Sequence, residues 1–266
     1  MGEEKQMNPG LALAGLAVGL LVGMTGMGAG SLMTPILISV FGIPAGTAVG
    51  TDLVYAAITK TFGAARHHQL KNVNRELGLW MAAGSVPAAI IGVFWLYNVF
   101  SGDINAWLPD VIGYALVLVG IAVAIRTFVT VRGIMDSSKL PVDGPLTRKH
   151  RIMALCIGVV FGFILGLTSV GSGVFFGMAL VLLFPLSGRR VVGTDLFHGM
   201  MVTIAAGLAT IVWGHPNFHY VGAILIGSIP GILIGSHFTS RVIEKALRGS
   251  IATVLAACGL KLLGAW

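Results

Sequence analysis

The 266-residue chain is too apolar and too poor in charged residues to resemble a soluble protein of this length. Hydrophobic residues make up 56% of it and charged residues 10%, whereas soluble chains average about 25% charged residues. The mean hydropathy is +0.91. This composition argues against soluble enzymes, nucleic-acid binders and disordered chains. The net charge of +7 fits Lys and Arg gathered in cytoplasmic loops better than a nucleic-acid partner. We therefore expect an all-α, polytopic membrane protein in the inner (cytoplasmic) membrane.

Two kinds of apolar segment follow one another along the chain. Uninterrupted segments, each near the 20 or so residues that a spanning helix needs, are predicted at Pro44–Ala65, Asn74–Tyr97, Trp107–Val129, Val191–Trp213, Phe218–Thr239 and Leu247–Leu263. Two further regions are divided by glycine clusters into short pieces: Leu11–Met24 with Ser31–Phe41, and Met153–Leu167 with Val174–Phe184. Eleven residues of helix rise about 16 Å, which is roughly half the hydrocarbon thickness. We expect each of these regions to be a broken helix.

The sequence repeats itself at an offset of 143 positions, without a gap from Gly15 to Val99. Val49-Gly50-Thr51-Asp52-Leu53 recurs as Val192-Gly193-Thr194-Asp195-Leu196, and Gly28 and Gly30 of the first break recur as Gly171 and Gly173 in the second. Such a match predicts two homologous halves. We expect a first repeat at 1–131, a cytoplasmic linker at 132–150 and a second repeat at 151–266.

The positions of Lys and Arg predict how the halves are oriented. The loop after the first long helix is basic, whereas its counterpart in the second half, Gly214–Asn217, has no Lys or Arg. If basic loops face the cytoplasm, the two halves have inverted topology. Arg189 and Arg190 follow the second broken segment, and the basic linker precedes it. That segment is therefore expected to enter and return on the same side as a helical hairpin, followed in each half by about three spanning helices. The sequence is compatible both with re-entrant arms and with arms that cross the membrane as short tilted helices.

The motifs also resemble a known family. Gly26-Met27-Gly28-Ala29-Gly30, Pro35, Ala48-Val49-Gly50-Thr51, Asn72-Val73, Gly84 and Pro87 occur in an order that resembles the TauE/SafE sulfite exporters. The resemblance covers nearly the whole chain. It implies a permease for small sulfur-containing anions such as sulfite, sulfoacetate or thiosulfate.

The two glycine breaks are the candidate anion-binding site. A helix N-terminus exposes unpaired N–H groups and the positive end of its dipole, and transporters with inverted repeats place such ends near the membrane midplane. Glycines let the backbone approach a ligand, and hydroxyls add donors. The candidate substrate-binding residues are Thr25, Gly26, Gly28, Gly30, Ser31, Thr168, Ser169, Gly171, Ser172 and Gly173. The alternative interpretation is that these glycines only permit tight helix packing.

Lys60 is a further candidate substrate-binding residue, because it lies within the predicted membrane segment Pro44–Ala65, where a charge is costly. It either attracts the anion or extends to the inner surface near Arg66. Its counterpart in the second half is Thr203.

Asp52 and Asp195 occupy equivalent positions early in their helices. Carboxylates there suit the helix dipole, so a structural cap is the simpler role, and we favour it for Asp52. The functional alternative is proton or cation coupling. His198 follows Asp195 by three residues, on the same helix face, and an Asp–His pair can relay protons. Asp52, Asp195 and His198 are therefore the coupling candidates.

These features predict a secondary transporter for a small sulfur anion. The chain lacks the Gly-x4-Gly-Lys-Ser/Thr motif for ATP, so an ion gradient, the membrane potential or the substrate gradient would drive it. An anion channel is an alternative. An intramembrane serine hydrolase using Ser172 and His198 is a weaker one, because the Gly-x-Ser-x-Gly elbow is missing. We expect no catalytic residue, cofactor or metal. The expected partners are the lipid bilayer, a coupling proton or sodium ion, and a second copy in a homo-oligomer.

Overall fold

A computed structural model describes residues 9–25, 30–99, 103–131, 146–171, 173–184, 186, 188–238 and 256–264. Helices make up nearly all of this part of the chain, and no strand occurs in it. The helices are α1 (Pro9–Thr25), α2 (Gly30–Ser39), α3 (Ala45–Gln69), α4 (Arg75–Phe94), α5 (Ile104–Val131), α6 (Arg148–Thr168), α7 (Val174–Leu183), α8 (Gly188–Trp213) and α9 (Phe218–Phe238), and a single π-helical turn, η1 (Trp95–Val99), extends α4. The all-α fold expected from the sequence is confirmed.

Five helical segments are long and apolar enough to cross a membrane: Arg75–Val99, Ile104–Ile125, Arg148–Thr168, Arg190–Trp213 and Phe218–Gly235. The chain is therefore a multi-pass membrane protein. The helix predicted at Leu247–Leu263 lies mostly outside the described residues, of which 256–262 are helical.

One predicted piece is longer than expected. The first arm of the second broken segment, predicted at Met153–Leu167, is the 21-residue helix α6. Its polar first turn belongs to the helix because the Thr147 side chain accepts a hydrogen bond from His150 N and caps it. At 1.5 Å per residue α6 is about 31 Å long, enough to cross the hydrocarbon, whereas the ten residues of α7 cover only about half of it.

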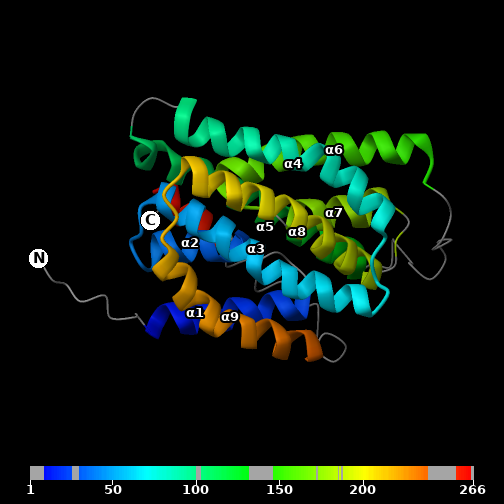
Figure 1. The fold of residues 1–266 in the computed structure, drawn as a ribbon, viewed down its shortest axis with the longest axis horizontal. Coiled ribbons are helices and arrows are strands. Elements are labelled where there is room, and N and C mark those ends of the chain that lie inside the picture. The colour runs from blue at the N-terminus through cyan, green and yellow to red at the C-terminus, as the bar shows by residue number, and fades with distance from the viewer. Residues whose placement is uncertain are drawn as a thin grey trace, which may run out of the picture.

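Two tightly packed helix pairs form opposite sides of the bundle (Figure 1). The pair of α4 and α6 lies on one side and the pair of α1 and α9 on the other, with α2, α3, α5, α7 and α8 between them. Glycines allow the close approach: an added Cβ at Gly162 of α6 would lie 2.6 Å from the backbone of Ser85. This is the small-residue packing typical of membrane helices.

The contacts in one pair recur in the other at the offset of the sequence repeat. Gly162 contacts Ser85. Gly19, which is 143 positions before Gly162, contacts Ser228, which is 143 positions after Ser85. The turns show the same relation: Asn74 N donates to Thr194 Oγ1 over 2.9 Å, and Asn217 N donates to Thr51 Oγ1 over 3.0 Å. The pairs α1–α9 and α4–α6 and the two turns thus make equivalent contacts between the halves in an exchanged arrangement.

Basic side chains gather at one end of the bundle. Asn74, between α3 and α4, bonds to Thr194 in the first turns of α8, so the end of α3 lies beside the start of α8. Arg151, in the first turn of α6, pairs with Glu76 in the first turn of α4 at 2.8 Å. We call this the basic end; it includes Arg66, Arg75, Arg148 and Arg151 and the backbone of Arg189. Arg66 and Arg189 are therefore on the same side, as the sequence predicts.

The broken segments begin and end on single sides of the bundle. Both α6 and α8 start at the basic end, so α6 and α7 enter and return there. Helix α1 runs parallel to α9, because Ala12, Leu16 and Leu20 meet Gly227, Gly231 and Gly235 in order. Helices α3 and α9 both start at the end opposite the basic end, because Asn217, just before α9, bonds to Thr51 in the first turns of α3. Helix α1 starts at that end with α9, and α2 leads back to it at the start of α3, so the α1–α2 segment enters and returns there. This agrees with the hairpins predicted from the loop charges.

Candidate functional site

Asp52 joins three parts of the chain in the middle of the bundle. It lies on α3 and is fully buried. Its Oδ2 accepts hydrogen bonds from Thr34 Oγ1 of α2 at 2.6 Å and from Ser169 Oγ, at the second glycine break, at 2.7 Å. Helix α3 begins at Ala45, so Asp52 sits in its third turn and does not cap it. The cap role favoured from the sequence is wrong, because the third turn of α3 is too far from its N-terminus for the carboxylate to bond the free backbone N–H groups there.

The second carboxylate oxygen of Asp52, Oδ1, has different surroundings from Oδ2. Among the described residues, Oδ1 has no hydrogen-bond partner. A buried carboxylate oxygen without a partner is costly, and in a native protein it calls for an explanation such as a bound proton, ion or water.

Lys60 is buried two turns further along α3, with 1% of its surface exposed. It does not extend to the inner surface, so that interpretation is wrong. Its charge interacts most strongly with Asp195 of α8 and next with Asp52. The Nζ atom lies against the α8 backbone, where a Cβ added to Gly199 would be 2.9 Å away. The glycine leaves the room that the ammonium group fills.

His198 completes the cluster of charged and titratable side chains, but not as the partner expected from spacing. Its Nε2 lies 2.7 Å from Ser85 Oγ of α4, and its ring meets the edge of Phe176 of α7 with centroids 4.3 Å apart. Lys60 is the charged group that acts on it. Asp195 is instead the strongest electrostatic partner of Lys60. We call Asp52, Lys60, Asp195 and His198 the central cluster.

The second glycine break lies against this cluster. Ser169 adopts a left-handed conformation with φ +57°, which ends α6 and directs its hydroxyl to Asp52. Gly171 has φ +92°, and a Cβ there would collide with the Phe175 ring, so this position requires glycine. Gly173 is the N-cap of α7.

The remaining predicted residues of the breaks divide into two groups. Thr168 uses its hydroxyl within the helix end: it donates to Ile164 O and accepts from Val170 N. Gly26, Gly28 and Ser172 lie outside the described residues, and for Thr25, Gly30 and Ser31 the structure gives the helical backbone but not the surroundings. Of the candidate anion-binding residues, the structure thus brings Ser169 and Lys60 to the cluster.

The two aspartates occupy equivalent positions but have different surroundings. The equivalents of Thr34 and Ser169 in the other half are Gly177 and Gly26, which have no hydroxyls. Asp195 therefore lacks the two donors that Asp52 has, and the ammonium group of Lys60 acts on it instead. The sequence repeat thus places a carboxylate at the equivalent position of each half, but the residues around the two carboxylates differ.

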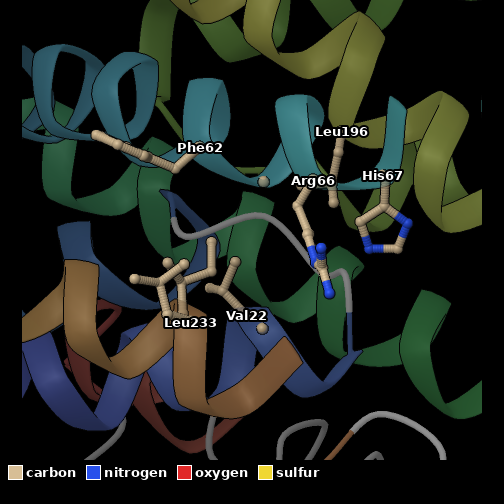
Figure 2. A pocket seen from close by; sticks show the side chains of 9 residues that line it. Val22, Phe62, Arg66, His67, Leu196 and Leu233 are labelled. Carbon is tan, nitrogen blue, oxygen red and sulfur yellow. The ribbon is translucent and has the colours of Figure 1, made fainter. Parts of the chain in front are cut away.

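A small pocket lies one helical turn from Lys60 toward the basic end (Figure 2). It is lined from α1, α3, α8 and α9, with Arg66 and His67 at its polar side and Leu196 and Leu233 among its apolar residues. Its volume of about 10 Å³ is room for about one water molecule. A Cβ added to Gly63 would contact Leu196 at 3.4 Å, so the absence of a side chain there leaves room on this side of the pocket.

The sequence analysis missed three residues of the site: Thr34, Ser85 and Gly199. Thr34 and Ser85 are small polar residues in apolar helices, which is an available signal for a buried polar contact. Gly199 has no sequence signal that distinguishes it from the other glycines of the chain.

A multi-pass helical bundle that encloses a lysine, two aspartates and a histidine at its centre defines a membrane transporter, because intramembrane charges mark ion and substrate pathways. The model of the family Sulfite exporter TauE/SafE matches residues 11–262. The chain belongs to this family.

Curated relatives agree with this class. The chain is 41% identical over 259 residues to the probable membrane transporter protein YjnA of Bacillus subtilis (strain 168), covering 97% of this chain and 100% of that protein. It is 27% identical over 251 residues to the probable membrane transporter protein YdhB of the same organism, covering 92% and 96%. A probable membrane transporter protein of Haemophilus influenzae is 25% identical over 244 residues, covering 86% and 85%. No solved structure matches the chain significantly. With relatives named as transporters, the chain is a transporter rather than an enzyme.

Proposed function

We propose that the chain is a secondary transporter of small sulfur-containing oxyanions, such as sulfite, sulfoacetate or thiosulfate, across the cytoplasmic membrane. The family name supports the substrate class. The observation that carries the proposal is Lys60: a lysine with 1% exposure in the centre of the bundle, whose charge interacts with Asp52, the carboxylate to which Ser169 of the second glycine break donates. Burying such a charge is costly unless it serves a function.

The anion is held between Lys60 and the second break. The single hydroxyl hydrogen of Ser169 is donated to Asp52, which ties the break to α3, and α7 begins at Gly173 with its positive dipole end toward the break. Gly26, Gly28, Gly30, Ser31, Gly171 and Ser172 complete the proposed site from the two breaks.

The burial of the central cluster from solvent favours a transporter over a channel. Asp52, Lys60, Asp195 and His198 are each at most 3% exposed, so the described conformation is occluded around them. The contacts exchanged between halves also support two inverted repeats, 1–131 and 151–266, that move relative to one another. The linker proposed at 132–150 lies mostly outside the described residues, and its last three belong to α6.

The test is counterflow of labelled sulfite in proteoliposomes, with sulfoacetate, thiosulfate and chloride as competitors. The proposal predicts saturable flux that the sulfur anions inhibit and chloride does not. Flux that rises linearly with concentration would indicate a channel, and no flux of any of the sulfur anions would contradict the proposal.

The glycine break has its own control. Gly171→Ala forces a side chain into the Phe175 ring at φ +92°, whereas Gly222→Ala adds a Cβ with nothing within 4 Å. The first variant should lose flux and the second should keep it. Equal flux in both variants would remove the second break from the site.

A further inference from the structure

The central cluster carries an uneven charge. With His198 neutral, the ammonium of Lys60 stands against the carboxylates of Asp52 and Asp195, which leaves one net negative charge in a buried space. An arriving anion adds negative charge where little water can screen it. The cluster can therefore accept the anion only if a cation accompanies it or one carboxylate becomes neutral.

We propose that Asp52 takes up a proton together with the anion, so that the transporter is a proton–anion symporter. The inference rests on the proposed function and names its coupling ion. The proton binds to Asp52 Oδ1 as the anion approaches Lys60, and it leaves when the anion leaves. One proton cancels one of the two negative charges of a dianion such as thiosulfate, so the net charge of the site changes by one unit rather than by two.

Asp52 is chosen over Asp195 by its contacts. Oδ2 of Asp52 already accepts two hydroxyl hydrogen bonds, whereas its Oδ1 is buried without a hydrogen-bond partner among the described residues and is the place for a proton. Oδ1 of Asp195 is likewise buried without a hydrogen bond in the described part of the chain, so the choice between the two aspartates depends on Lys60. Asp195 is the stronger electrostatic partner of Lys60. Protonating Asp195 would remove the main counter-charge of the lysine, but protonating Asp52 releases Lys60 from the weaker of its two carboxylates, which makes its charge available to the anion.

Among the described residues, few other titratable groups face Asp52 and Lys60. Tyr55 lies on α3 with Asp52, and its hydroxyl faces Ser228 of α9. His198 of α8 faces Lys60 across the helix interface and lies against Ser85 and Phe176. From α2 and the second break, the groups that reach Asp52 are the hydroxyls of Thr34 and Ser169, which carry no charge. No second acidic side chain in the described part of the chain shares the hydroxyl bonds of Asp52.

The experiment counts protons on binding. Thiosulfate is the probe, because it does not itself take up a proton near neutral pH. Its binding to the purified protein is measured by titration calorimetry in buffers of different ionisation enthalpy, with sulfite and sulfoacetate as further ligands. We expect uptake of about one proton per thiosulfate and an apparent Kd that rises by up to about tenfold per unit of pH. Asp52→Asn should bind thiosulfate with no proton uptake, and the control Asp110→Asn, at an exposed position, should behave as wild type.

The outcomes separate the two proposals. Binding of thiosulfate without proton uptake by the wild-type protein overturns the inference alone, and this result does not depend on any variant folding. Binding that requires sodium and takes up no proton overturns it as well. Proton uptake that persists unchanged in Asp52→Asn overturns the role of Asp52. If none of the three anions binds, the proposed function fails and the inference fails with it.

Discussion

Ser169 and Asp52 are 117 positions apart in the chain, yet the hydroxyl of Ser169 donates to the Asp52 carboxylate over 2.7 Å in the buried centre of the bundle. This bond ties the break between α6 and α7 to the helix that carries Lys60. It also joins the two halves of the sequence repeat. The proposed anion site depends on this connection, because it brings the break and the lysine to one place.

Removing this hydroxyl should destabilise the protein measurably. A hydrogen bond to a charged group contributes about 1.5–3 kcal/mol, so Ser169→Ala should lower the free energy of unfolding by about that amount and reduce sulfite flux. The measurement is thermal unfolding in detergent together with flux in proteoliposomes. Thr61→Val is the control, because Thr61 is exposed and its hydroxyl bonds only to Ala57 O within its own helix. If both variants have the same melting temperature, the hydrogen bond between Ser169 and Asp52 contributes no more to stability than the exposed bond of Thr61.

Gly199 is predicted to set the position of Lys60. In Gly199→Ala the new Cβ would lie 2.9 Å from Lys60 Nζ, and the flexible lysine can move aside at little cost in stability. We expect an unchanged melting temperature and an affinity for sulfite that is weaker by about tenfold, equivalent to about 1.4 kcal/mol. Binding is measured by titration calorimetry, and Gly222→Ala is the matched control. Wild-type affinity in Gly199→Ala would show that the ammonium group need not occupy this place.

The fold could be predicted from the sequence more completely than the site. Helix positions followed from the lengths of apolar runs, and the hairpins from loop charges such as those of Arg66 and Arg189, because both signals are local and strong. The start of α6 was missed because its first turn is polar and is fixed by a cap at Thr147 rather than by hydropathy. The bond of Asp52 to Thr34 and Ser169 depends on how three segments pack, which no periodicity in one segment reveals.

The paired glycines are predicted to be essential for packing. Gly162→Ala places a Cβ 2.6 Å from the Ser85 backbone, and overpacking of this kind typically costs about 1–3 kcal/mol. Gly222→Ala, which has open space, should instead raise stability slightly, because alanine favours helix over glycine. Thermal unfolding of the two variants should therefore shift in opposite directions. A stable Gly162→Ala would contradict the close contact of α4 and α6.

The two ends of the bundle should face different compartments. Single cysteines at His68, at the basic end, and at Asp103, beyond the opposite end of α4, can be introduced after Cys156 and Cys258 are replaced by alanine. Because basic loops remain in the cytoplasm, a membrane-impermeant maleimide should label position 103 in right-side-out vesicles and position 68 only in inverted ones. Labelling of both positions from the same side would refute this orientation.

The most direct test of the central claim is sulfite flux in a charge-balanced variant of the central cluster. Lys60→Gln with Asp195→Asn removes one positive and one negative charge together, so no additional unbalanced charge is buried and the protein should fold. If Lys60 binds the anion, this variant should melt near the wild-type temperature and lose at least about 90% of saturable sulfite flux, a factor of about ten. Flux at the wild-type rate and affinity would contradict an anion site at Lys60.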